Sequence, residues 1–176
     1  MTWKSLPNRG ETLRAVTAEA DRRLDGRLPM DVAGVTETFG DELSLYGALQ
    51  LRWHARLSGR IERELLLNQP MDLESAVVAA WRAAAADLPG TRAILDRHRA
   101  HPLDAAMAEA VAKATAKEHT MLAVAAGLAG PQDAAAARIG ARIEEDARAT
   151  YVLPQRVRAP QRRASFLDRL RSALAA

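Results

Sequence analysis

The sequence is poor in the residues that several protein classes require. It contains no cysteine, so disulfide bonds, thiolate zinc sites, iron–sulfur clusters and cysteine nucleophiles are excluded. Aromatic residues make up only 4% of the 176 residues, and few stretches are rich in β-branched residues, which disfavours a β-sheet. The longest apolar run, Met121 to Ala129, is far too short to cross a membrane. With no apolar leader behind Met1, we expect a cytoplasmic protein that is not integral to a membrane.

Catalytic and nucleotide-binding signatures are also missing. The sequence has no phosphate-binding glycine loop, no strand followed by GxGxxG, no HExxH, no GxSxG and no EF-hand loop. These absences favour a non-catalytic protein over an enzyme, and nothing in the sequence names a cofactor.

Basic charge is concentrated at the end of the chain. The whole sequence carries a net charge of +3, but residues 154–176 hold six arginines against Asp168 alone. The remaining body is therefore slightly acidic. Because a DNA-binding domain usually carries a basic face on its folded body, this distribution disfavours nucleic acid as a partner.

The residues that are abundant, alanine, leucine and arginine, are good helix formers. Apolar residues recur at helical spacing, which predicts an all-α, single-domain helical bundle in residues 1–153. We expect four long helices plus one or two shorter flanking helices. The expected helices cover residues 11–24, about 39–68, 73–87, 91–99, 103–128 and 131–153.

Several details of these helices follow from local signals. Gly26 suits the left-handed cap that ends the first helix, and Thr38 and Asp72 suit the caps that begin the second and third. In the second helix the charged residues lie largely off the apolar stripe, namely Glu42, Arg52, Arg56, Arg60 and Arg63. The helix over 103–128 is rich in alanine and apolar on most sides, so we expect it to lie innermost. Pro131 is expected to open the last helix.

The tail has two parts. Residues 154–163 read as a basic Pro/Arg linker, and residues 164–176 as an amphipathic C-terminal helix capped by Ser165. A helix this short is marginal alone in water and is expected to order by docking. It can dock on a partner protein, on its own bundle or, in peripheral contact, on an anionic membrane. The residues predicted to carry docking are Phe166, Leu167, Leu170, Leu174, Arg162 and Arg163.

Glu118 and His119 form the most informative polar pair. The periodicity places Glu118 on an apolar face, where a carboxylate is costly unless it is paired or binds something. One interpretation is a metal or cofactor site in a bundle of ferritin-like architecture, with Glu118, His119, His54 and Glu62 as the candidate ligands. Diiron bundles, however, use Glu-x-x-His twice, and neither copy is present. The other interpretation is a structural pair with an arginine such as Arg142.

Two tryptophans at stripe positions, Trp53 and Trp81, are predicted to be core anchors. With Glu118 and His119 they are also the candidates for lining a small-ligand pocket beside the alanine-rich helix. The acidic run Glu144-Glu145-Asp146 is interpreted as a solvated helix face.

Three functions follow from these observations. The leading hypothesis is a non-catalytic interaction or scaffold module that docks a protein partner, or a second copy of itself, through the C-terminal helix. The alternatives are a metal- or cofactor-binding bundle centred on Glu118 and His119, and a small-ligand-binding regulator.

Overall fold

The computed structural model describes residues 8–68 and 72–152, with the side chains of residues 67 and 68 left out. The regular secondary structure in this part of the chain consists of helices alone, with no strand. The helices are α1 (Arg9–Arg23), α2 (Val35–Phe39), α3 (Glu42–Asn68), α4 (Leu73–Asp87), α5 (Pro89–Ala100), α6 (Ala105–Ala125) and α7 (Ala136–Ala149). The predicted all-α helical bundle is confirmed.

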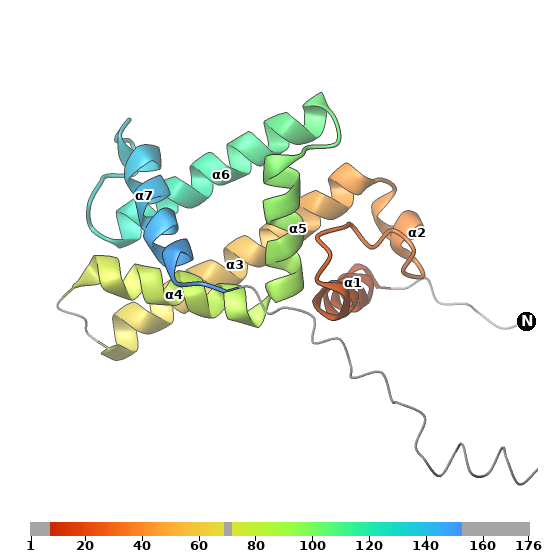
Figure 1. Ribbon diagram of the computed structural model, residues 1–176, viewed down its shortest axis with the longest axis horizontal. Helices are drawn as coiled ribbons and strands as arrows, with labels where there is room; N and C mark the ends of the chain where they lie inside the picture. Colours follow the sequence, from red (N-terminus) through yellow and green to blue (C-terminus); the bar gives the residue numbers. More distant parts are fainter. Residues whose placement is uncertain (1–7, 69–71, 153–176) are drawn as a thin grey trace, which may run out of the picture.

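The long helix α3 runs through the molecule and the other helices are arranged around it (Figure 1). α4 packs against the second half of α3, and α6 packs with α7. α5 stands across α3, with α1 on one side of it and α7 on the other. α5 contacts α1, α3, α4 and α6, so this short helix ties the two ends of the bundle together.

Side-chain caps fix where four of the helices begin. Asn8, Asp41, Asp72 and Asp104 each accept a hydrogen bond from a backbone N–H of the following turn. The cap predicted at Asp72 is confirmed, whereas the cap predicted at Thr38 is wrong. Thr38 lies inside α2, where its Oγ1 donates to the Gly34 carbonyl at 2.5 Å. Gly40, at φ 81°, ends α2 and leaves Asp41 to begin α3.

The first helix ends at Arg23, one residue before its predicted end, and its cap is Leu24 rather than Gly26. Leu24 adopts the left-handed conformation, with φ 51°, and its N–H donates to the Ala20 carbonyl. Gly26 is also left-handed, with φ 71°, but a Cβ there would lie 3.0 Å from the Ala93 carbonyl oxygen and 3.1 Å from the Arg97 side chain. Gly26 therefore allows the loop after α1 to pack on α5 rather than capping α1.

The core consists of two apolar clusters. The larger surrounds Trp53 and Trp81, which are both fully buried, so the prediction that they are core anchors is confirmed. The smaller lies between α1, α2 and the first half of α3. α3 and α5 contribute to both clusters, since Leu95 belongs to the first and Ile94 to the second. Members of the smaller cluster are Val16, Ala20, Val35, Phe39, Leu45, Leu49 and Ile94.

The prediction that residues 103–128 form the innermost helix is wrong. Of the 21 residues of α6, five are buried: Met107, Val111, Glu118, Leu122 and Ala123. Leu103 and Val124 are 54% and 37% exposed, and several alanines face solvent. Alanine favours helix wherever it lies, so an alanine-rich pattern does not show which helix is central. α7 likewise begins later than expected, at Ala136 rather than Pro131.

Two glycines mark the closest helix contacts. A Cβ at Gly90 would lie 2.1 Å from the Ala20 carbonyl carbon, and a Cβ at Gly140 would lie 1.7 Å from the His119 carbonyl oxygen. Only a residue without a side chain permits these approaches of α5 to α1 and of α7 to α6.

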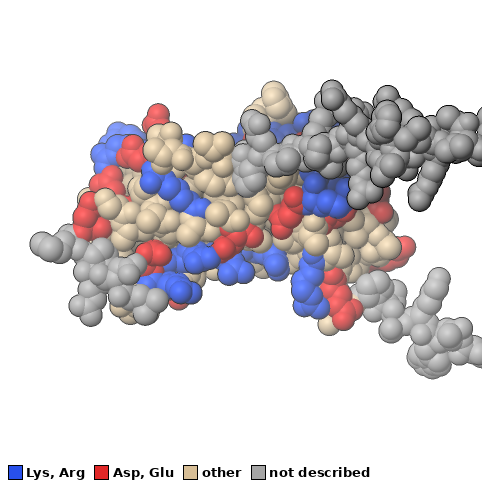
Figure 2. Space-filling model, turned by 60° about the horizontal axis from the view of Figure 1, so that its bottom comes forward, with Lys and Arg blue, Asp and Glu red and all other residues tan. Residues whose placement is uncertain are grey.

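None of the helices described here is long and apolar enough to span a membrane. Acidic and basic side chains are mixed on the face shown in Figure 2, with Lys and Arg gathered in a row along its lower edge.

Candidate functional site

A buried arginine lies at the centre of the bundle. Arg92 of α5 is only 1% exposed, and its guanidinium carbon lies 4.6 Å from the ring centroid of Trp53. At this distance the cation is attracted to the face of the ring. A charge at this depth requires ionic partners as well.

Two carboxylates supply those partners. Arg92 pairs with Asp96 one turn away, at 2.8 Å, and with the buried Glu118 of α6 at 3.6 Å. Trp81 donates its indole N–H to Glu118 at 3.2 Å. Arg92 Nη1 and Trp53 Nε1 are buried without a hydrogen-bond acceptor.

A second layer of charged groups surrounds Glu144 of α7. Its carboxylate accepts hydrogen bonds from Arg99 at 2.8 and 2.9 Å and from Arg148 at 2.7 and 2.9 Å, and it contacts His119 Nε2 at 2.6 Å. Burial alone would raise the pKa of Glu144. The His119 hydrogen bond and the nearby guanidinium groups outweigh burial and hold this pKa well below its ordinary value.

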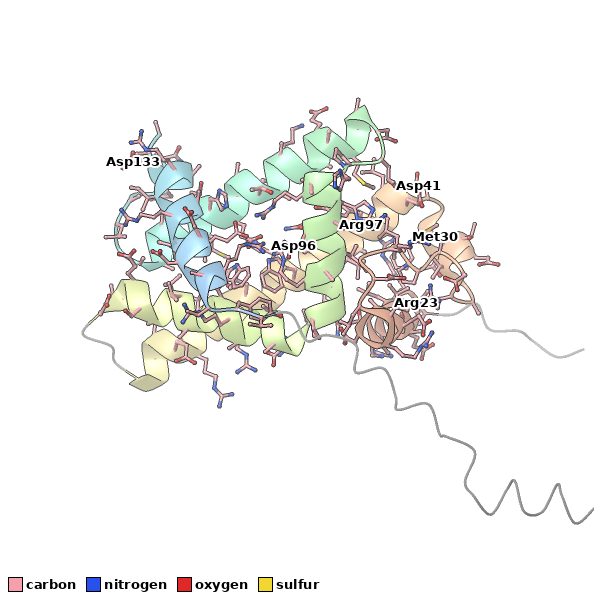
Figure 3. The ribbon with its side chains drawn as sticks, viewed as in Figure 1. Arg23, Met30, Asp41, Asp96, Arg97 and Asp133 are labelled. Carbon is pink, nitrogen blue, oxygen red and sulfur yellow. The ribbon has the colours of Figure 1, made fainter. Side chains whose placement is uncertain are left out.

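Asp96 connects the two layers. Arg148 donates to it at 2.6 and 3.1 Å, opposite its pair with Arg92. Figure 3 shows Asp96 on the side of α5 that faces α7, whereas Arg97 lies on the side toward α1. Burial would raise the pKa of Asp96, but Arg92 and Arg148 together lower it. The two layers form one connected network, which joins α5, α6 and α7.

The structure shows which group pairs with Glu118. It is 1% exposed, as its periodicity predicted, and it pairs with an arginine. That arginine is Arg92 rather than Arg142, whose guanidinium pairs with Glu74 of α4 at 3.3 Å.

The interpretation of Glu144-Glu145-Asp146 as a solvated face is wrong for its first residue. Glu144 is only 3% exposed, and Glu145 and Asp146 are exposed. Glu144 lies on the side of α7 that faces both α5 and α6. There its carboxylate pairs with Arg99 of α5 and contacts His119 of α6.

The predicted metal ligands are not brought together. Within residues 8–68 and 72–152, no group of three or more His, Asp or Glu side chains is placed to hold a metal ion. His119 is engaged by Glu144, and Glu62 accepts a hydrogen bond at an exposed position from Ser58 at 3.4 Å. The geometry therefore gives the metal hypothesis no support.

The predicted pocket around the tryptophans is filled. Trp53 and Trp81 pack edge to face at 5.7 Å, and Tyr151 packs edge to face on Trp81 at 5.6 Å. A separate hollow of about 400 Å³ lies along α6, with lining residues from α5 and α7 as well, and His119 is among the residues that line it. It is otherwise lined by Arg99, Pro102, Ala108, Val111, Ala112, Thr115, Ala116 and Ala137.

A groove of about 600 Å³ lies along the outer face of α3. Its α3 residues recur every three or four positions, so they form one continuous helix face. We call this feature the arginine groove. It is lined by Leu13 of α1 and by Ala48, Leu51, Arg52, Ala55, Arg56, Gly59, Arg60 and Arg63 of α3.

The groove carries positive charge that the protein only partly neutralises. Arg60 forms a bidentate pair with Asp87 at 2.7 and 2.6 Å, and Arg56 lies 3.8 Å from the same carboxylate. Among the described residues, neither Arg52 nor Arg63 forms an ion pair. The Nε of Arg52 is buried without a hydrogen-bond acceptor. The sequence pattern placed these arginines off the apolar stripe but gave no sign that the surface between them is hollowed.

The residues predicted to dock a partner, Phe166, Leu167, Leu170, Leu174, Arg162 and Arg163, lie outside the described part of the chain. Comparison with protein-family models, with curated proteins and with solved structures gives no match.

Proposed function

We propose that this chain is a non-catalytic interaction module that binds an acidic segment of a partner protein in the arginine groove. The observation that carries the proposal is the difference in charge pairing between the interior network and the arginine groove. The acids and bases of the interior are engaged with one another. By contrast, within the described residues neither Arg52, which is half-buried and within electrostatic range of Asp21, nor the exposed Arg63 forms an ion pair. Unpaired arginines beside apolar surface are suited to carboxylates carried on an apolar segment.

The charge of the tail also favours a negatively charged partner. Residues 154–176 carry six arginines and one aspartate, so both the groove and the tail favour acidic groups by charge complementarity. We propose that the amphipathic helix predicted at 164–176 provides a second contact with the same partner.

Charge reversal tests the groove. The probe is a fluorescein-labelled peptide of glutamate and leucine, and fluorescence anisotropy gives its affinity. In the Arg52→Glu/Arg63→Glu variant we expect binding to weaken by at least about tenfold, because attraction becomes repulsion at both ends of the groove.

The matched control is Lys117→Glu/Arg138→Glu. It changes the net charge equally at exposed positions of α6 and α7 and should leave the affinity within about twofold of the wild type. Equal losses in the two variants, or no binding by the wild-type protein, would show that the groove is not the site.

A small-ligand function has its own observation, the hollow of about 400 Å³ beside α6. A mostly apolar lining with a few polar groups, here His119 and Thr115, is typical of small-molecule sites. A ligand bound there should shift backbone amide resonances of Thr115 and His119 in NMR spectra and leave those of α1 unchanged. Shifts confined to other helices would exclude this hollow.

A further inference from the structure

The arginine groove has the dimensions of a helix. Its α3 residues extend from Ala48 to Arg63, which corresponds to about 22 Å at the rise of an α-helix. One partner helix of about four turns would cover this length. An extended segment would span the same distance with about seven residues, so length alone does not choose between the two conformations.

Gly59 distinguishes them. Glycine inside a helix costs about 1 kcal/mol relative to alanine, and at two helical positions of this chain a second helix that comes close accounts for it. Gly140 has the His119 backbone against it, and Gly90 has that of Ala20. Gly59 lies within α3, yet a Cβ built on it meets nothing within 4 Å. The same is true of Gly47 in α3, so an unpacked glycine alone does not indicate a partner. What sets Gly59 apart is that it lines the arginine groove.

The side chains around Gly59 complete the pattern of a helix-packing face. Ala48 and Ala55 share its face of α3, so the floor of the groove is made of small residues, while Leu51 is 70% exposed beside them. Small residues allow two helix backbones to approach closely, and an exposed leucine offers an apolar contact. Arginines flank this floor along its length.

We infer that the partner segment is an acidic amphipathic α-helix that packs lengthwise on α3, with its closest approach at Gly59. This inference rests on the proposed function and specifies the conformation of the ligand. The apolar face of the partner helix lies on the alanine and glycine floor, and its carboxylates meet Arg52, Arg56 and Arg63. The chain's own C-terminal segment is a poor occupant, because its six arginines would be repelled by those of the groove.

Two peptide isomers and two glycine variants test the inference. The peptides have identical glutamate, leucine and alanine content, but only one places glutamate and leucine on opposite faces of a helix. Gly59→Leu fills the floor of the groove. Gly47→Leu is the matched control, since Gly47 also lies in α3 with nothing within 4 Å of its Cβ position and does not line the groove.

We expect the amphipathic isomer to bind wild-type protein at least about tenfold more tightly than the shuffled isomer. Gly59→Leu should lose at least about tenfold in affinity for the amphipathic isomer, and Gly47→Leu should lose none. Both variants should keep the circular dichroism of the wild type, because both side chains enter open space.

Each other outcome contradicts the inference in a separate way. Equal binding of both isomers, still sensitive to Arg52→Glu/Arg63→Glu, would mean that the groove binds acidic peptides without requiring a helix, and the proposed function would stand. Equal binding by wild type and Gly59→Leu would place the contact elsewhere. Sedimentation showing a dimer that Gly59→Leu dissociates would assign the groove to a second copy. Phosphatidylserine vesicles that displace the peptide would assign it to a membrane surface.

Discussion

At the scale of single residues, Glu144 and its neighbour Glu145 differ sharply in their electrostatic surroundings. Both are glutamates of α7, but Glu144 is buried against Arg99, Arg148 and His119, and Glu145 is exposed. The lowered pKa of Glu144 means that the folded state binds its proton less readily than the unfolded state does. Folding therefore stabilises the charged form.

Glu144→Gln should both destabilise the protein and change its response to acid. The stabilisation is present above the ordinary glutamate pKa, 4.5, and is lost as pH falls below that value toward the lowered one. We expect the variant to lose about 2 kcal/mol at pH 7, because Arg99 and Arg148 lose the buried carboxylate that pairs with them and His119 loses its hydrogen-bond partner. Its unfolding free energy should also fall less steeply than the wild type's below pH 4.5.

Urea unfolding at a series of pH values measures both effects. Glu145→Gln provides the control, and its stability and acid response should match those of the wild type. An acid response of Glu144→Gln as steep as that of the wild type would mean that Glu144 is not a principal source of acid sensitivity, and would point to other carboxylates such as Asp96, whose pKa is also lowered.

The residues of the central network differ in how far the sequence predicts them. Glu118 can be recognised because it interrupts an apolar stripe in a long helix. Arg92 cannot, since α5 has only 12 residues and an arginine in a short helix is normally exposed. Its burial depends on Trp53, Trp81 and Glu118, which reach it from α3, α4 and α6, and no local pattern encodes that convergence.

At the scale of elements, the same substitution should have opposite effects at two helical glycines. Gly140→Ala places a methyl group against the His119 backbone, which forces α7 away from α6. We expect it to cost at least about 2 kcal/mol. Gly59→Ala enters open space and should stabilise the protein by up to about 1 kcal/mol through helix propensity. Urea unfolding of both variants measures the difference, and a stable Gly140→Ala protein would contradict the close approach of α6 and α7.

The positions of the long helices are predictable here because they depend on local signals, namely the apolar period and aspartate at a cap, although Pro131 gave the wrong start for α7. Helix depth is not predictable in this way. The alanine-rich pattern of α6 indicates a helix that neighbours can approach, but the helices are arranged around α3 instead. The short helix α5 is also well buried, because Gly90 lets it approach α1 and because Arg92 finds partners in the core. The arginine groove could not be predicted from the sequence either, because a hollow depends on where α1 lies relative to α3.

At the scale of the whole molecule, net charge and apolar contact should affect binding through different rate constants. Removing residues 154–176 takes away six arginines and one aspartate and changes the net charge from +3 to −2. The association rate with the acidic amphipathic peptide should then fall by about tenfold at low salt and recover partly at high salt, because long-range attraction is lost and is screened by ions.

The final prediction separates the charge of the tail from its proposed docking helix. Arg162→Gln/Arg163→Gln should lower only the association rate, whereas the truncation should also raise the dissociation rate, because Phe166, Leu170 and Leu174 no longer contact the partner. Surface plasmon resonance measures both rates, with a partner segment long enough to reach beyond the groove. If the truncated chain dissociates at the wild-type rate, the tail acts through its charge alone, and the arginine groove with α3 accounts for the bound state.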